Sequence, residues 1–123
     1  MNPRPVHIAG IGTAVPPHAL PQAQSRELAR HLFGEVPGLE RLLSVFDNSG
    51  IETRYLAMPP EWYLTARSFP EKNAVWARVA LELAEAASRR ALAQAGLEPQ
   101  ELSGVLFAST TGIATPSLDA YLI

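Results

Sequence analysis

The stretch of sequence with the clearest chemical potential is Ser109–Ser117, which reads STTGIATPS. It combines several hydroxyl side chains with Gly and Ala, and it follows an apolar segment at 104–109 that we expect to be a buried strand. Ligands favour the carboxyl ends of strands in α/β folds. Hydroxyls form adaptable hydrogen bonds, and small residues leave room for a ligand. The run is therefore a candidate pocket lining, with a plain loop as the alternative.

Other catalytic constellations are missing from the sequence. There is no Cys, which excludes disulfides, thiolate metal sites and a Cys nucleophile within these residues. His7, His18 and His31 show no metal-ligand spacing, so structural or surface roles suit them better. No G-x-S-x-G elbow is present, and the carboxylates are scattered over expected helix faces, where solvated ion pairs are the usual role.

The segment Gly10–Gly12 reads GIG and invites comparison with dinucleotide-binding loops. That fingerprint requires G-x-G-x-x-G, but Val15 occupies the position of the third glycine. A proline-rich stretch follows in place of a helix N-terminus. We therefore interpret the segment as a turn after a strand.

Composition narrows the class of protein. The 123 residues fit one small domain or part of a larger one, and 47% hydrophobic with 18% charged residues indicates a globular chain. A net charge of -2 provides no electrostatic footprint for nucleic acid or an anionic membrane. The sequence has no long apolar run and no signal-peptide pattern, so we expect a cytoplasmic protein.

The hydrophobic pattern predicts an α/β fold with a mainly parallel, incomplete sheet. The alternation of strands and helices supports this class, and three strands leave the sheet with open edges. The expected elements are strands at 6–12, 51–58 and 104–109, a loop at 13–22, and helices at 22–33, 39–48, 68–96 and from Leu118.

The long helix at 68–96 is the clearest element. Ser68 and Glu71 have the spacing of a capping box. One narrow stripe carries the i,i+4 ion pairs Arg78–Glu82 and Glu85–Arg89, and the rest of the surface is apolar and rich in Ala. Such a helix is expected to be covered by other protein segments on most sides, and a chain of this size has too few residues to cover it.

Several successive segments resemble type III polyketide synthases, the bacterial relatives of plant chalcone and stilbene synthases. The resemblance runs in order through essentially the whole chain. The segments are IAGIGTAVPPHALPQ, LERLLSVFDNSGIETRYLAMPPEWY, SFPEKNAVWARVALELAEAASRRAL, AGLEPQELSGVLFASTTG and STTGIATPSLDA.

The resemblance implies a thiolase-like α/β fold and a homodimer. It implies an acyltransferase that condenses an acyl-CoA starter with malonyl-CoA by decarboxylative Claisen chemistry. The family uses a Cys nucleophile with His and Asn, and it needs no bound metal or organic cofactor. All three of those catalytic residues are expected beyond Ile123, so the resemblance implies no catalytic residue within this chain.

The resemblance also implies roles for a few residues. Thr111 matches a pocket-lining Thr, and Thr115 matches the place where plant enzymes carry a Met that reaches into the partner subunit's cavity. Gly112 lies where TTG replaces the family's TTSG, so the spacing departs from the pattern there. Arg41 matches one of three basic residues that grip CoA phosphates, with a solvated helix residue as the alternative. The other two positions are occupied by Ser44 and Asn48.

Taken together, residues 1–123 are expected to form the N-terminal part of a chalcone synthase-like domain, truncated before the catalytic Cys and inactive by itself. The open sheet edges, the over-apolar long helix and the apolar end of the chain favour this hypothesis. A ketoacyl-acyl-carrier-protein synthase III is the enzymatic alternative, since it shares a GIxxR strand like GIETR at 50–54. A short non-catalytic protein that pairs with a partner is the other.

Overall fold

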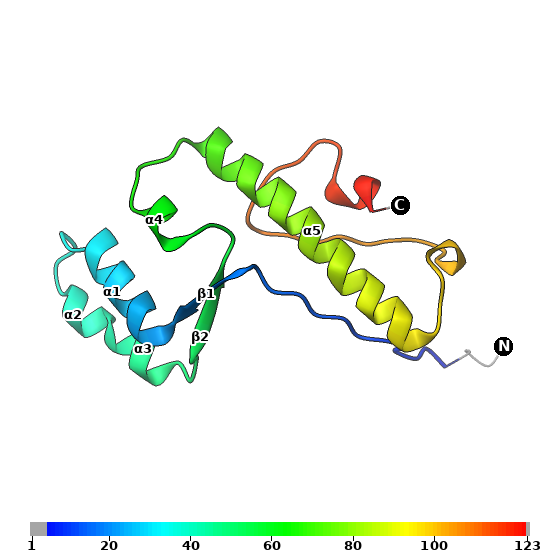
Figure 1. Cartoon of the computed structure of the whole chain (residues 1–123), viewed down its shortest axis with the longest axis horizontal. Helices are drawn as coiled ribbons and strands as arrows, with labels where there is room; N and C mark the ends of the chain where they lie inside the picture. Colours follow the sequence, from blue (N-terminus) through cyan, green and yellow to red (C-terminus); the bar gives the residue numbers. More distant parts are fainter. Residues whose placement is uncertain (1–4, 123) are drawn as a thin grey trace. The chain divides into compact units, whose positions relative to one another are not determined.

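The computed structural model describes residues 5–122, which divide into two compact units. Unit 1 comprises residues 5–15 and 69–122, and unit 2 comprises residues 16–68. Unit 2 is therefore inserted between two parts of unit 1 that are distant in sequence, as the colours of Figure 1 show.

The sheet of unit 2 is a two-stranded antiparallel ladder. β1 (His18–Pro21) pairs with β2 (Thr53–Leu56), and Pro21 stands opposite Thr53. The predicted strand at 51–58 is thus confirmed in its centre, whereas the predicted loop at 13–22 is wrong at β1. Pro21 fits because it is the last residue of a strand in a sheet that has only edges, so its missing N–H breaks no central ladder.

Most helices of unit 2 lie between the two strands in the sequence, and the first of them contacts both strands. The predicted helix at 22–33 is confirmed, with its end one residue earlier than expected. The predicted helix at 39–48 is interrupted at Leu43, whose side chain is only 2% exposed. Leu43 itself keeps helical backbone angles, with φ of -64° and ψ of -16°. The helices are α1 (Gln22–Leu32), α2 (Leu39–Leu42), α3 (Ser44–Asn48) and α4 (Pro60–Tyr63).

The core of unit 2 is small. Leu20 from β1 and Leu43 are its buried apolar residues among those described. Ser25 of α1 is buried as well, and its hydroxyl donates a hydrogen bond of 3.2 Å to the carbonyl oxygen of Pro21. The hydroxyl is therefore satisfied, as a buried polar group must be to avoid a large desolvation cost.

Unit 1 is built on α5 (Phe69–Ala95), which confirms the predicted long helix. Gly96 follows it in the left-handed conformation, with φ of 66°. The ion pairs Arg78–Glu82 and Glu85–Arg89 are also confirmed, at 3.2 and 2.8 Å. Two 3-10 helices, η1 (Pro99–Glu101) and η2 (Leu118–Tyr121), complete the unit, so the helix expected from Leu118 is a single tight turn. None of the helices within residues 5–122 is both long and apolar enough to cross a bilayer.

The predicted strands at 6–12 and 104–109 do not form within the described residues. A strand is defined by the neighbour that pairs with it, and neither segment has such a neighbour in this part of the chain. Their apolar side chains remain in the open: Val6 is 97% exposed and Leu106 is 91% exposed. The parallel pairing expected for them is accordingly not observed, and the sheet that is present is antiparallel.

The segment 5–15 instead runs along α5 (Figure 1). A Cβ atom at Gly10 or Gly12 would collide with the helix backbone, at the carbonyls of Ala91 and Ala87 respectively. The amide of Ile11 donates a hydrogen bond of 2.7 Å to the side chain of Gln94. The GIG motif therefore serves a close approach between two backbones, and its interpretation as a turn is wrong.

Candidate substrate-binding loop

The hydroxyl-rich loop at 109–117 is fastened to the second turn of α5. The side-chain amide of Asn73 donates a hydrogen bond of 2.8 Å to the carbonyl oxygen of Ile113. The amide N–H of Ile113 donates one of 2.8 Å back to the side-chain oxygen of Asn73. One carboxamide thus satisfies both polar groups of one loop residue, which fixes the position and the orientation of that residue at once.

A second contact lies one helical turn further along α5. The indole ring of Trp76 packs against Gly112 so closely that a Cβ atom at this position would overlap the ring. Asn73 and Trp76 are three residues apart, so they share one face of the helix. Gly112, predicted as a substrate-binding residue, therefore has a packing role in this structure, and substrate binding by it stays a prediction.

Shallow hollows adjoin the loop. One, of about 290 Å³, is lined by Trp76, Phe107, Ser109, Gly112, Ile113, Ala114, Ser117 and Leu118. Another, of about 360 Å³, is lined by residues of α5 and η2 together with Thr115 and Pro116. Of the three loop residues singled out from the sequence, Gly112 and Thr115 each line a hollow. Thr111 is exposed and lines neither of these two.

Sequence reasoning did not assign Asn73 and Trp76 to the site, although a signal was present that Asn73 needs a hydrogen-bond partner. The charged stripe of α5 begins with Glu71, and a helix turns by about 100° per residue. Asn73 therefore points away from that stripe, among the Ala-rich and apolar positions. A carboxamide on an otherwise apolar helix face needs a hydrogen-bond partner, and a loop backbone is the commonest place to find one.

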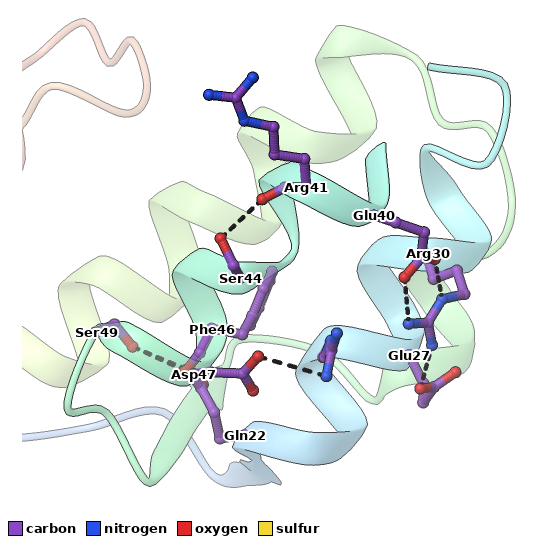
Figure 2. Close-up of polar contacts among 10 residues, drawn as sticks. Gln22, Glu27, Arg30, Glu40, Arg41, Ser44, Phe46, Asp47 and Ser49 are labelled. Atoms are coloured by element: carbon purple, nitrogen blue, oxygen red, sulfur yellow. Dashed lines mark hydrogen bonds and ion pairs between the residues drawn. The ribbon is translucent and has the colours of Figure 1, made fainter. Parts of the chain in front are cut away.

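Arg41, the predicted phosphate contact, lies in α2 of unit 2. Its side chain is exposed and points away from the neighbouring polar groups in Figure 2. The guanidinium makes no hydrogen bond or ion pair with any residue between 5 and 122. Ser44, one of the two positions where the basic pattern is lost, donates a hydrogen bond of 2.7 Å to the carbonyl oxygen of Arg41. The structure thus leaves the charge of Arg41 available for a ligand.

The arginines of α1 are engaged in a different way. Arg30 binds Glu40 of α2 in a forked arrangement, with distances of 2.7 and 3.1 Å, and it also contacts Glu27 (Figure 2). The hydrogen bonds from Arg30 lower the pKa of Glu40. In turn, the carboxylates of Glu40 and Glu27 raise the pKa of Arg30. Arg26 lies 3.5 Å from Asp47. These two arginines are neutralised locally, which sets Arg41 apart.

A hollow of about 530 Å³ in unit 2 carries the wrong charge for a phosphate. Its lining includes Arg26 but also the carboxylates of Glu27, Asp47 and Glu52. Three negative charges against one positive charge disfavour an anion there. Within residues 5–122, moreover, no three His, Asp or Glu side chains lie close enough together to hold a metal ion.

Comparison with known proteins identifies relatives of this chain. No family model matches the chain. The chain is 40% identical over 121 residues to the 1,3,6,8-tetrahydroxynaphthalene synthase of Streptomyces peucetius subsp. caesius. The crystal structure of the corresponding Streptomyces coelicolor enzyme, a bacterial type III polyketide synthase, matches with a TM-score of 0.80 and 31% identity. The chain is homologous to the type III polyketide synthases.

The homology covers nearly all of this chain and a minor part of each relative. The match to the Streptomyces peucetius enzyme covers 97% of this chain and 32% of that enzyme. The match to the Streptomyces coelicolor structure covers 92% of this chain and 33% of that protein. A chalcone synthase-like protein of Bacillus subtilis (strain 168) is 35% identical over 94% of the chain and 33% of its own length. The chain thus spans about a third of the relatives that it matches. The predicted fold class, a partial α/β structure of the thiolase-like type, is confirmed.

Proposed function

We propose that residues 1–123 are the N-terminal part of a type III polyketide synthase. The intact enzyme would be a cytoplasmic, homodimeric acyltransferase that condenses an acyl-CoA starter with malonyl-CoA. The observation that carries the proposal is the 40% identity that extends over 97% of this chain but over 32% of a tetrahydroxynaphthalene synthase. The sequence contains no Cys, so the nucleophile that holds the acyl thioester would be supplied by a further segment.

Two features of the described residues support roles in substrate binding. The loop around Thr111, Gly112 and Thr115 offers hydroxyls and small residues beside shallow hollows, which suits an acyl or polyketide chain. Arg41 offers an unpaired, solvent-facing guanidinium, which suits a phosphate of CoA. Both sites would be completed by parts of the enzyme outside this chain, and the exposed apolar side chains of segments 5–15 and 104–109 would pack against those parts.

The test is to express the complete coding sequence from which this chain comes, and to incubate the purified protein with acetyl-CoA and malonyl-CoA. We expect release of CoA and CO₂ together with a polyketide product. The 123-residue chain, tested in parallel, should release no CoA above the rate without protein. Turnover by the chain alone would contradict the proposal, and so would a complete protein that binds neither CoA ester.

A further inference from the structure

We propose that Asn73 is a positioning residue for the substrate loop, and that it acts by clamping the backbone of Ile113. The inference deepens the proposed function, on which it rests, because it names the residue that sets where Thr111 and Thr115 stand. The side chain of Asn73 would touch the loop backbone and no substrate.

The clamp is tight on both of its sides. The two hydrogen bonds between Asn73 and Ile113 are each 2.8 Å long, which is at the short end of the usual range for N–H···O bonds. They join residues 40 positions apart in the sequence, so they tie the loop to α5, an element distant from it in the chain. A further hydrogen bond lies within the loop, where the amide of Thr111 donates to the hydroxyl of Ser109 at 3.3 Å.

Asn is suited to this task by its chemistry. A carboxamide carries a donor and an acceptor side by side, which matches the donor and the acceptor of one residue in the loop. Asp would keep the acceptor and lose the donor, and Ala would lose both. Gln would keep both groups but place them one methylene further from the helix.

The position of the clamp connects it to the predicted pocket. Ile113 lies midway between Thr111 and Thr115, and its neighbour Gly112 rests on the ring of Trp76. The clamp and the ring together hold the centre of the loop, so the two threonines on either side leave it in fixed directions. Without the clamp, each hydroxyl would sample several directions, and a ligand would have to order the loop when it binds.

The experiment uses the protein encoded by the complete coding sequence, with acetyl-CoA as starter and malonyl-CoA varied. The variants are Asn73→Ala and Asn73→Asp, with Lys72→Ala as the matched control, because Lys72 is the exposed neighbour on the same helix. We expect Asn73→Ala to raise the KM for malonyl-CoA by about tenfold, with kcat within about twofold of the wild type, because the loop binds substrate and the reacting groups lie elsewhere. Asn73→Asp should give a smaller rise.

A second readout needs no ligand. Hydrogen exchange at the amide of Ile113 should accelerate by at least about tenfold in Asn73→Ala, whereas Asn73→Asp should retain most of the protection. Amides in the middle of α5 should exchange as in the wild type. Lys72→Ala should change neither the exchange nor the kinetics.

The outcomes separate the two proposals. An unchanged Ile113 exchange rate in Asn73→Ala would overturn the positioning role, whatever the kinetics show. A fall in kcat at unchanged KM would also overturn it, because that pattern indicates loss of folded protein. If the wild-type protein has no synthase activity, the proposed function fails, and the exchange measurement alone decides whether Asn73 orders the loop.

Discussion

The indole ring of Trp76 occupies the space into which a Cβ atom at position 112 would project. This relationship explains why a glycine stands in the centre of a loop whose neighbours are Thr and Ile. The ring belongs to a side chain of α5, so an added methyl group at position 112 would force the ring or the loop to shift. The loop and the helix are therefore fitted to each other at this point.

Gly112→Ala should destabilise unit 1 by about 1–3 kcal/mol, the usual cost of overpacking, because the new methyl group meets the Trp76 ring. Urea unfolding monitored by Trp fluorescence measures the change. Gly104→Ala is the control, since a Cβ at Gly104 meets nothing within 4 Å. Equal midpoints for the two variants would refute the proposed fit between the loop and the ring.

Gly12→Ala should cost at least as much, about 3 kcal/mol, because the obstacle is the backbone carbonyl of Ala87. A helix backbone yields less readily than the end of a side chain. The expected result is a lower urea midpoint and faster hydrogen exchange at the amide of Ile11, which bonds to Gln94. If Gly12→Ala unfolds at the wild-type midpoint, segment 5–15 does not lie against α5 as described.

The sequence is sufficient to predict those helices and strands whose signals lie within a few neighbouring residues. α5 was predicted from its capping residues, its ion-pair spacing and Gly96, all of which act within a few residues. The strands at 6–12 and 104–109 were not predictable in the same way, because strand formation depends on a partner that apolarity alone does not guarantee. β1 was missed because Pro21 argues against a strand unless the strand lies at an edge.

The candidate site was predictable only where its signal is local in the sequence. The composition of Ser109–Ser117 marked the loop, and the family resemblance singled out Thr111, Gly112 and Thr115. The anchors Asn73 and Trp76 lie about 40 residues earlier, and their pairing with the loop is a tertiary contact. No local pattern encodes which helix face meets which loop residue.

Gln22→Ala should destabilise unit 2 by about 1–2 kcal/mol. The side-chain amide of Gln22 donates hydrogen bonds to the carbonyl of Phe46 at 2.6 Å and to the hydroxyl of Ser49 at 2.9 Å. Its side-chain oxygen also accepts one from Arg54 at 3.2 Å. Each such bond contributes about 0.5–1.5 kcal/mol net, and the gains are not additive. Gln24→Ala, at an exposed position of the same helix, should leave the urea midpoint unchanged; an equal loss in both variants would contradict this role.

The pKa of Glu40 is lowered by its hydrogen bonds with Arg30, so the pair stabilises the fold in a pH-dependent way. A carboxyl whose pKa is lower in the folded state contributes stability above its unfolded pKa, near 4.5, and loses that contribution as the pH falls through the folded pKa. An NMR titration should therefore show the Glu40 midpoint rising in Arg30→Gln. It should stay unchanged in Arg41→Gln, and a midpoint that is the same in all three proteins would exclude the ion pair in solution.

If Arg41 makes the proposed contact with CoA, Arg41→Ala in the protein encoded by the complete coding sequence should raise the KM for malonyl-CoA by about two- to fivefold, which corresponds to the modest energy of an exposed charge contact. The effect should shrink as the salt concentration increases, because salt screens exposed charges. Arg41→Lys keeps the charge and should retain most of the affinity. If Arg41→Ala binds malonyl-CoA as the wild type does at low salt, Arg41 is a solvated helix residue and no more.

The discontinuity of unit 1 has a consequence for how the chain is made. Residues 5–15 leave the ribosome well before α5, and the hydrogen bond from Ile11 to Gln94 spans 83 positions. Unit 2 can fold while the first segment still has no helix to pack on, whereas unit 1 must wait until α5 has emerged. Because contacts between distant positions slow folding, closure of the N-terminal segment over α5 should follow the folding of unit 2. The apolar side chains of Val6 and Ile8 stay exposed before and after this closure, so both remain accessible to chaperones throughout.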